Sequence, residues 1–91
     1  MSEIKIVRNI ERSTLDEMGV FDWPVWGKEI STFDWYYDSS ETSYFLAGDV
    51  VVTPKGGAPV QISKGDLVTF AAGMLCTWQI RSAVKKHYSF D

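Results

Sequence analysis

Two segments decide the fold of this chain: ETSYFLAG at residues 41–48 and GDLVTFAAGMLC at residues 65–76. In the first, an apolar and aromatic run lies between Glu41 and Gly48. In the second, a similar run follows Gly65 and ends before Gly73. Runs rich in aromatic and β-branched residues and bounded by glycine are typical of strands. The two segments therefore predict two strands, each of which ends at a turn.

The rest of the chain predicts more strands of the same kind. Residues 28–37 alternate, which places Phe33, Trp35 and Tyr37 on one face. Further strands are expected at residues 4–10, 50–53, 59–62, 76–81 and 84–90, with a hairpin turn at 54–57. Short strands at a spacing of roughly 8–12 residues indicate a sandwich or a barrel. The predicted fold class is therefore all-β.

One short helix is expected near the N-terminus. Ser13 or Thr14 can cap its first turn, because Asp16 or Glu17 follows three residues later. Gly19 is expected to end it. This is the only helix that the sequence predicts.

Composition narrows the class of protein. The 91 residues are expected to form a single domain, 1–91. A formal charge of -3 argues against a nucleic-acid partner, which would need a basic face. The single cysteine excludes an intramolecular disulfide and fits a reducing compartment. No apolar run is long enough for a signal peptide or a membrane span, so the expectation is a cytoplasmic protein without a membrane partner.

The two segments also resemble the paired motifs of the cupin superfamily. The first of those motifs combines a His-x-His pair, a glutamate and a glycine, and the second combines a glycine, Pro-x-Gly and a histidine. The glycines and the glutamate match here at Glu41, Gly48, Gly65 and Gly73. The first histidine pair falls on Asp34/Tyr36 or Trp35/Tyr37, the second histidine on Cys76, and the proline on Ala71. The chain therefore has the glycines and the glutamate of the cupin motifs, but not their histidines.

Several blocks together make residues 20–91 similar to the small single-domain cupins of the ureidoglycine-aminohydrolase-like group. These blocks include Trp23-Pro24-x-Trp26, Phe33-Asp34-Trp35-x-Tyr37 and Lys86-His87-Tyr88. The resemblance implies a double-stranded β-helix, that is, a jelly-roll barrel, which is often dimeric. The enzyme that names the group is a longer, metal-dependent protein with intact histidines. Its reaction is therefore not transferred to this chain.

Glu41 is the first candidate for a functional residue. The resemblance implies that it points into the barrel, where a carboxylate among apolar side chains needs a partner. The candidate partners are a metal ion, the Tyr37 hydroxyl and His87. Glu41 and Tyr37 are then the candidate catalytic residues, as acid/base and electrophile. A different strand register would instead leave the Glu41 carboxylate in solvent.

The candidate ligand-binding residues lie on the same strand faces as the motif positions. They are Trp35, Tyr37, Phe45, Cys76 and Trp78. These aromatic residues could equally fill the core or a dimer interface, and a free cysteine is often a buried small hydrophobe. Trp23 and Trp26 fall outside the motifs and are expected to cover the open end of the barrel or to contact a partner subunit.

Glu41, Cys76 and His87 are the candidate metal ligands. A metal site normally takes roughly three or four protein ligands, and the resemblance leaves Glu41 and Cys76, with His87 as a third. The alternative for His87 is exposure to solvent beside Lys85 and Lys86. The sequence therefore predicts, at most, a weakly bound divalent metal.

Three functions stay open at this point. The first is binding of a small-molecule ligand in the barrel of a homodimeric cupin. The second is a metal-dependent enzyme of isomerase, lyase or hydrolase type that uses Glu41 as its acid/base. The third is a structural or dimerisation barrel without a ligand.

Overall fold

The computed structural model describes residues 4–90, and these contain seven strands, one α-helix and one 3-10 helix. In chain order they are β1 (Ile4–Val7), α1 (Arg12–Met18), η1 (Val20–Asp22), β2 (Val25–Lys28), β3 (Ser31–Tyr36), β4 (Glu41–Pro54), β5 (Val60–Ser63), β6 (Leu67–Phe70) and β7 (Leu75–Phe90). The expectation of a mostly β fold with one short helix is confirmed.

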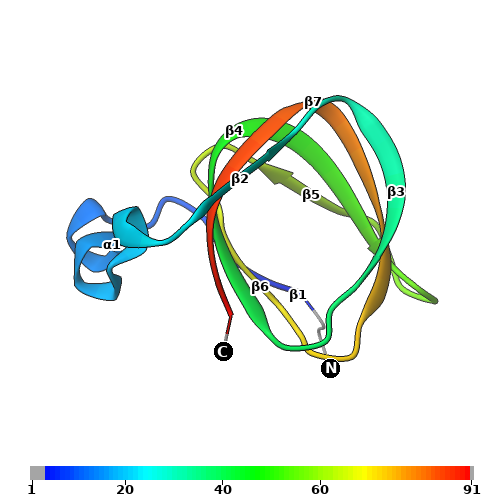
Figure 1. The fold of residues 1–91 in the computed structure, drawn as a ribbon, viewed down its shortest axis with the longest axis horizontal. Helices are drawn as coiled ribbons and strands as arrows, with labels where there is room; N and C mark the ends of the chain where they lie inside the picture. The colour runs from blue at the N-terminus through cyan, green and yellow to red at the C-terminus, as the bar shows by residue number, and fades with distance from the viewer. Residues whose placement is uncertain (1–3, 91) are drawn as a thin grey trace.

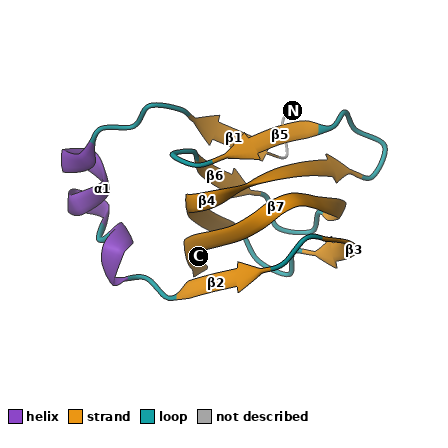
Figure 2. Cartoon of the chain, turned by 90° about the horizontal axis from the view of Figure 1, so that it is seen from above, coloured by secondary structure: helices purple, strands orange, loops and turns teal. Residues whose placement is uncertain are grey.

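The strands form one antiparallel sheet that curls into a barrel (Figure 1). Its main path runs β1-β6-β4-β7-β2, while β3 also pairs with β7 and β5 also pairs with β4. Figure 2 shows α1 outside the barrel, joined to it by the segments that follow β1 and precede β2. The interior of the barrel is therefore bounded by strands.

The two longest strands, β4 and β7, lie side by side over most of their length (Figure 2). Each was expected as two separate strands, with a turn at Gly48 in the case of β4. Instead, the pairing runs from Glu41 opposite Phe90 to Pro54 opposite Cys76, with register shifts between Phe45 and Val50. Gly48 lies within this irregular stretch and has a φ of 118°, a conformation that favours glycine. Such a bulge bends a strand without ending it.

The short helix differs from the expectation at its start and agrees with it at its end. It begins after Glu11, and no side chain caps it, so the predicted Ser13 or Thr14 cap is wrong. Both of these residues lie inside the first turn, where the backbone carbonyl of Glu11 accepts from the N–H groups of Thr14 and Leu15. Gly19 ends the helix in the left-handed region, with a φ of 74°.

Two other predicted strand bounds also change. The strand expected at 28–37 is shorter, because β3 covers Ser31–Tyr36 and Lys28 instead ends β2; both strands pair with β7. Phe33, Trp35 and Tyr37 share one face, as predicted, since all three line one cavity, although Trp35 is 50% exposed. The first strand ends at Val7 rather than at residue 10, because Asn9 adopts a φ of 57°, which an extended strand cannot continue.

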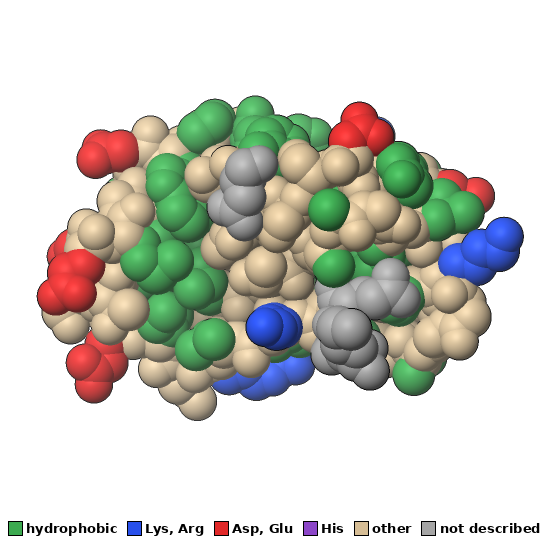
Figure 3. Space-filling view, turned by 90° about the horizontal axis from the view of Figure 1, so that it is seen from below, with side chains coloured by type: hydrophobic (Ala, Val, Ile, Leu, Met, Phe, Trp, Pro, Cys, Tyr) green, Lys and Arg blue, Asp and Glu red, His purple; other side chains and the backbone are tan. Residues whose placement is uncertain are grey.

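Two apolar clusters hold the fold together. The larger fills the barrel and includes Phe45, Phe70 and Trp78. The smaller joins Leu15 and Val20 to Leu67, so it fastens the helical segment to the outside of the barrel. Acidic side chains gather at the helical end of the molecule (Figure 3). Neither helix of residues 4–90 has the length and apolar character needed to cross a membrane.

Candidate functional site

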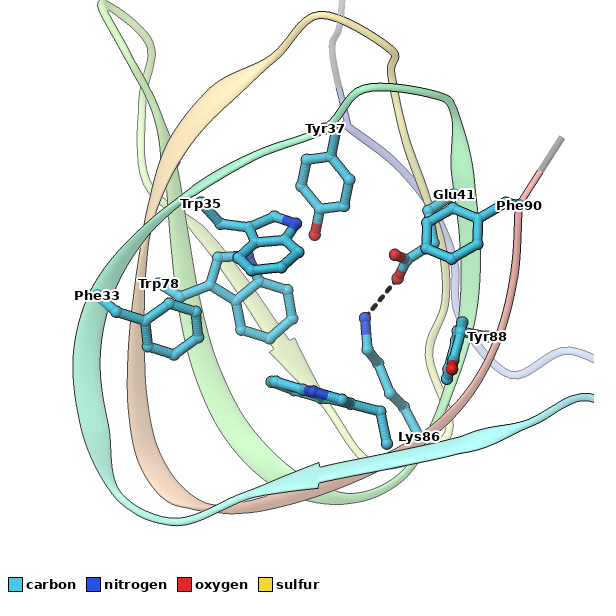
Figure 4. Close-up of a pocket in the computed structure, with 9 residues that line it drawn as sticks. Phe33, Trp35, Tyr37, Glu41, Trp78, Lys86, Tyr88 and Phe90 are labelled. Atoms are coloured by element: carbon cyan, nitrogen blue, oxygen red, sulfur yellow. Dashed lines mark hydrogen bonds and ion pairs between the residues drawn. The ribbon is translucent and has the colours of Figure 1, made fainter.

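A cavity of about 220 Å³ opens inside the barrel (Figure 4). Side chains from β2, β3, β4 and β7, and Tyr37 just after β3, form its wall. The lining residues are Trp26, Phe33, Trp35, Tyr37, Glu41, Trp78, Lys86, Tyr88 and Phe90. All of them except Glu41 and Lys86 are aromatic. The wall is therefore apolar, with one negative and one positive side chain.

Glu41 and Lys86 form a buried ion pair. The Lys86 Nζ atom donates to Glu41 Oε2 at 2.5 Å and to Ser43 Oγ at 3.0 Å. The Ser43 hydroxyl in turn donates to the same Oε2 atom at 2.6 Å. Both charged side chains are only 6% exposed. The three groups therefore form a closed polar triangle between the start of β4 and the end of β7.

Aromatic rings surround the Lys86 ammonium group. The Nζ atom lies 5.0 Å from the ring centroid of Trp78 and 5.2 Å from that of Trp26. Phe70 and Phe45 follow at 5.5 and 5.7 Å. Aromatic faces attract a cation and replace part of its lost hydration. Burial lowers the pKa of Lys86, while the neighbouring Glu41 carboxylate acts in the opposite direction.

Tyr37 brings a hydroxyl to the same cavity, and the indole N–H of Trp78 lies buried in the wall. Burial raises the pKa of Tyr37 above its usual range, and the negative charge of Glu41 raises it further. The hydroxyl therefore stays protonated at neutral pH. The Trp78 indole N–H opposes this effect weakly, but its geometry falls short of a hydrogen bond, so Trp78 Nε1 is buried without a partner among residues 4–90.

The raised pKa of Tyr37 predicts a dependence of stability on alkaline pH. Above its ordinary pKa of about 10, the phenol of the unfolded chain loses its proton while the folded chain keeps it. The unfolded state then binds fewer protons, so the free energy of unfolding falls as the pH rises. We expect Tyr37→Phe to remove up to about 1.4 kcal/mol per pH unit of this slope, as measured by urea unfolding between pH 8 and 11.

The matched control is Tyr36→Phe, because Tyr36 is the next residue and is 53% exposed. This variant should keep the slope of the wild-type protein. Equal alkaline slopes for Tyr37→Phe and the wild type would show that Tyr37 ionises as readily in the folded chain as in the unfolded one.

The structure brings together four of the predicted site residues. Trp35, Tyr37, Glu41 and Trp78 all line the cavity, with Glu41 and Tyr37 in its interior and Trp35 half exposed at 50%. Phe45 is fully buried in the core below Lys86 and does not line the cavity. Alternation of side chains along β3 and β4 accounts for these placements.

Cys76 and His87 lie apart from the cavity. The buried Cys76 thiol donates to the carbonyl of Trp35 at 3.6 Å, and Cys76 borders a second hollow of about 370 Å³ beside the 54–57 turn. Two charged residues of the described chain line that second pocket, Asp34 and Lys55, and both are exposed. The second pocket therefore contains no buried charge from these residues. His87 turns to the outer side, where Nδ1 lies 2.9 Å from the Trp23 carbonyl.

These positions do not fit a metal ion. Glu41, Cys76 and His87 are separated, and no group of three His, Cys, Asp or Glu side chains within residues 4–90 could hold a metal. At Glu41, the Lys86 ammonium group lies where a bound cation would need to approach the carboxylate. Two cations at that distance repel each other. Within the described residues, the cavity therefore offers one carboxylate to a metal ion, and Lys86 already neutralises the charge of that carboxylate.

Reasoning from the sequence missed Lys86 and several of the aromatic wall residues. The missed wall residues are Trp26, Phe33, Tyr88 and Phe90. The sequence did contain a signal for Lys86. Every second residue of a strand points to the same face, and Lys86 shares its face of β7 with the buried Cys76 and Trp78. Trp26, expected to cover the open end or a partner subunit, lies in the cavity wall with its ring centroid 5.8 Å from that of Trp78.

Known proteins similar to this chain identify its fold. Residues 15–88 match the EutQ-like cupin domain. A solved structure of a DUF861 family protein from Thermotoga maritima is 47% identical, covers 98% of this chain and 100% of its own, and superposes with a TM-score of 0.94. A DUF861 family protein from Pseudomonas syringae is 25% identical and covers 74% of this chain and 29% of its own, with a TM-score of 0.66.

A putative ethanolamine utilization protein Q from Salmonella typhimurium shares the fold at 18% identity and a TM-score of 0.66. The alignment covers 72% of this chain and 53% of that one. A search of curated proteins found no match. The expected cupin jelly roll is thus confirmed, and the chain belongs to the EutQ-like cupin family.

Proposed function

We propose that this cupin binds a small metabolite inside its barrel. The observation that carries the proposal is the aromatic cavity lined by Tyr37 and by the buried ion pair of Glu41 and Lys86. Ligand sites are typically apolar hollows with a few polar groups that fix the orientation of the ligand. We also propose that the chain is related to the ureidoglycine-aminohydrolase-like cupins within this family. In addition, we propose that it forms a homodimer.

The size of the cavity limits the ligand. A dry cavity of roughly 150 Å³ admits one benzene molecule, and this one has about 220 Å³. One ring with a small substituent therefore matches the space. Flat ligands also suit the wall, because aromatic rings attract one another in stacked or edge-to-face arrangements.

Acid–base catalysis is the second candidate function. Glu41 and Lys86 share a hydrogen bond of 2.5 Å, so a proton can pass between a carboxylate and an amine inside a site sheltered from water. Tyr37 adds a neutral hydroxyl that can polarise a carbonyl group. Positioned acids and bases of this kind support isomerase or lyase chemistry. No metal takes part in this version, because the residues do not fit one.

The experiment that tests binding is equilibrium dialysis of the purified protein against a metabolite mixture, read by mass spectrometry. We expect single-ring compounds to be enriched on the wild type, and their enrichment to change by at least about tenfold in Glu41→Gln, which is about 1.4 kcal/mol. Glu29→Gln is the matched control, because Glu29 is exposed and does not line the cavity.

Chemical change separates the two candidate functions. A compound recovered unchanged supports binding alone, and a compound converted by the wild type but not by Glu41→Gln supports catalysis. Absence of any enriched compound would contradict the proposed function and favour a barrel that serves only as a scaffold.

A further inference from the structure

We infer that the cavity selects an uncharged, planar ligand that carries a carbonyl group beside an N–H, as in a carboxamide or a lactam. This inference rests on the proposed function and names the class of ligand. It follows from the charges in the cavity, from the hydrogen-bonding atoms left open there, and from the shape of the wall.

The charge of the cavity is already balanced. Among residues 4–90, Glu41 and Lys86 are the only charged residues that line it, and their formal charges cancel. An anionic ligand would have to compete with Glu41 for Lys86, and a cationic ligand would have to compete with Lys86 for Glu41. In either case one charge would be left buried without a partner, which is strongly unfavourable. A neutral ligand leaves the ion pair in place.

The open hydrogen-bonding atoms are of both kinds. Within residues 4–90, the Ser43 hydroxyl and the Lys86 ammonium group both donate to Oε2 of Glu41, which leaves Oε1 as an acceptor at the cavity. The Tyr37 hydroxyl, whose pKa burial raises, is a donor in the wall of the same cavity. A complementary ligand therefore donates to a carboxylate and accepts from an O–H group. Amides and lactams do both through adjacent atoms.

The wall favours a flat molecule. The rings of Phe33 and Trp78 are stacked with an angle of 19° between their planes, while Trp26 stands edge-on to Trp78 at 78°. Figure 4 shows Lys86 and Glu41 pointing toward one another across the cavity from Phe33 and Trp78. A planar ligand can stack on the wall while its polar edge meets Glu41 and Tyr37.

The test uses three planar molecules of the same shape and different charge: benzamide, benzoate and benzamidine. Their binding is followed by the fluorescence of the tryptophans in the wall. We expect the wild type to bind benzamide at least about tenfold more tightly than either ion. Comparable or tighter binding of benzoate or benzamidine would overturn the inference.

Two variants are expected to change the order of affinities for the three molecules. Glu41→Gln leaves Lys86 without its counterion and should bind benzoate most tightly, whereas Lys86→Met leaves Glu41 and should bind benzamidine most tightly. Lys85→Met, an exposed neighbour, should keep the wild-type order. An unchanged order in both cavity variants would contradict the inference. The ranking by the wild type decides the question alone where a variant does not fold.

The two proposals fail in different ways. If dialysis finds a ligand that is an ion, the proposed function stands and the inferred class of ligand is wrong. If neither the metabolites nor the three probes bind, the proposed function itself is wrong.

Discussion

Substitution of Lys86 by methionine is expected to lower the free energy of unfolding by about 3–5 kcal/mol. Methionine can occupy the space of the lysine stem, so the loss comes from the charge and not from a cavity. Without Nζ, the Glu41 carboxylate stays 6% exposed with only the Ser43 hydroxyl as a partner. The measurement is urea unfolding at pH 7, followed by circular dichroism.

Lys85→Met is the matched control, because Lys85 precedes Lys86 but is exposed. It should change the free energy of unfolding by less than about 0.5 kcal/mol. The double variant Glu41→Gln/Lys86→Met should recover much of the loss, since replacing both members of a buried pair is often neutral. A loss in Lys86→Met no larger than that in Lys85→Met would show that the pair adds nothing to stability.

Substitution of Gly48 by alanine should lower the free energy of unfolding by about 3 kcal/mol or more. Two effects add at this position. The φ of 118° is one that a residue with a Cβ atom rarely adopts, and the added Cβ would lie 2.8 Å from the Cα of Val84. Because that neighbour is backbone of β7, relief requires β4 and β7 to move apart. Urea unfolding with the same probe measures the loss.

Gly56→Ala separates the two effects. Gly56 also has a positive φ, of 75°, but nothing lies within 4 Å of the added Cβ. Its cost should be about 1 kcal/mol, from backbone strain alone. Equal losses for Gly48→Ala and Gly56→Ala would mean that the contact with Val84 is relieved at no cost, and would contradict the close approach of the two strands.

The class of fold could be predicted because its signals are local. Alternation gave the faces of β3, and glycine gave the end of α1. The same residue type misled at Gly48, where a positive φ serves a bulge inside β4 and not a turn between strands. A bulge and a turn make the same demand on the backbone, so glycine alone does not distinguish them.

The site could be predicted only in part, because it depends on pairing between distant strands. Glu41 and its aromatic neighbours follow from alternation near the motif. Lys86 lies 45 residues further along the chain, and it meets Glu41 only because β7 pairs with the start of β4, where Lys86 lies opposite Phe45. His87, one of the three candidate partners of Glu41, lies one position beyond Lys86, and in a strand that difference selects the opposite face.

The position of β7 also bears on how the chain folds. This strand pairs with β2, β3 and β4, yet it is the last in the sequence. Every one of these pairings closes a long loop, and loops of this kind make folding slow, in the range of milliseconds to seconds for barrels with mainly distant contacts. Until β7 has paired, Glu41 lacks Lys86 and Trp26 lacks the ring of Trp78. The burial of Trp26 and Trp78, followed by their fluorescence, should therefore report the pairing of β7.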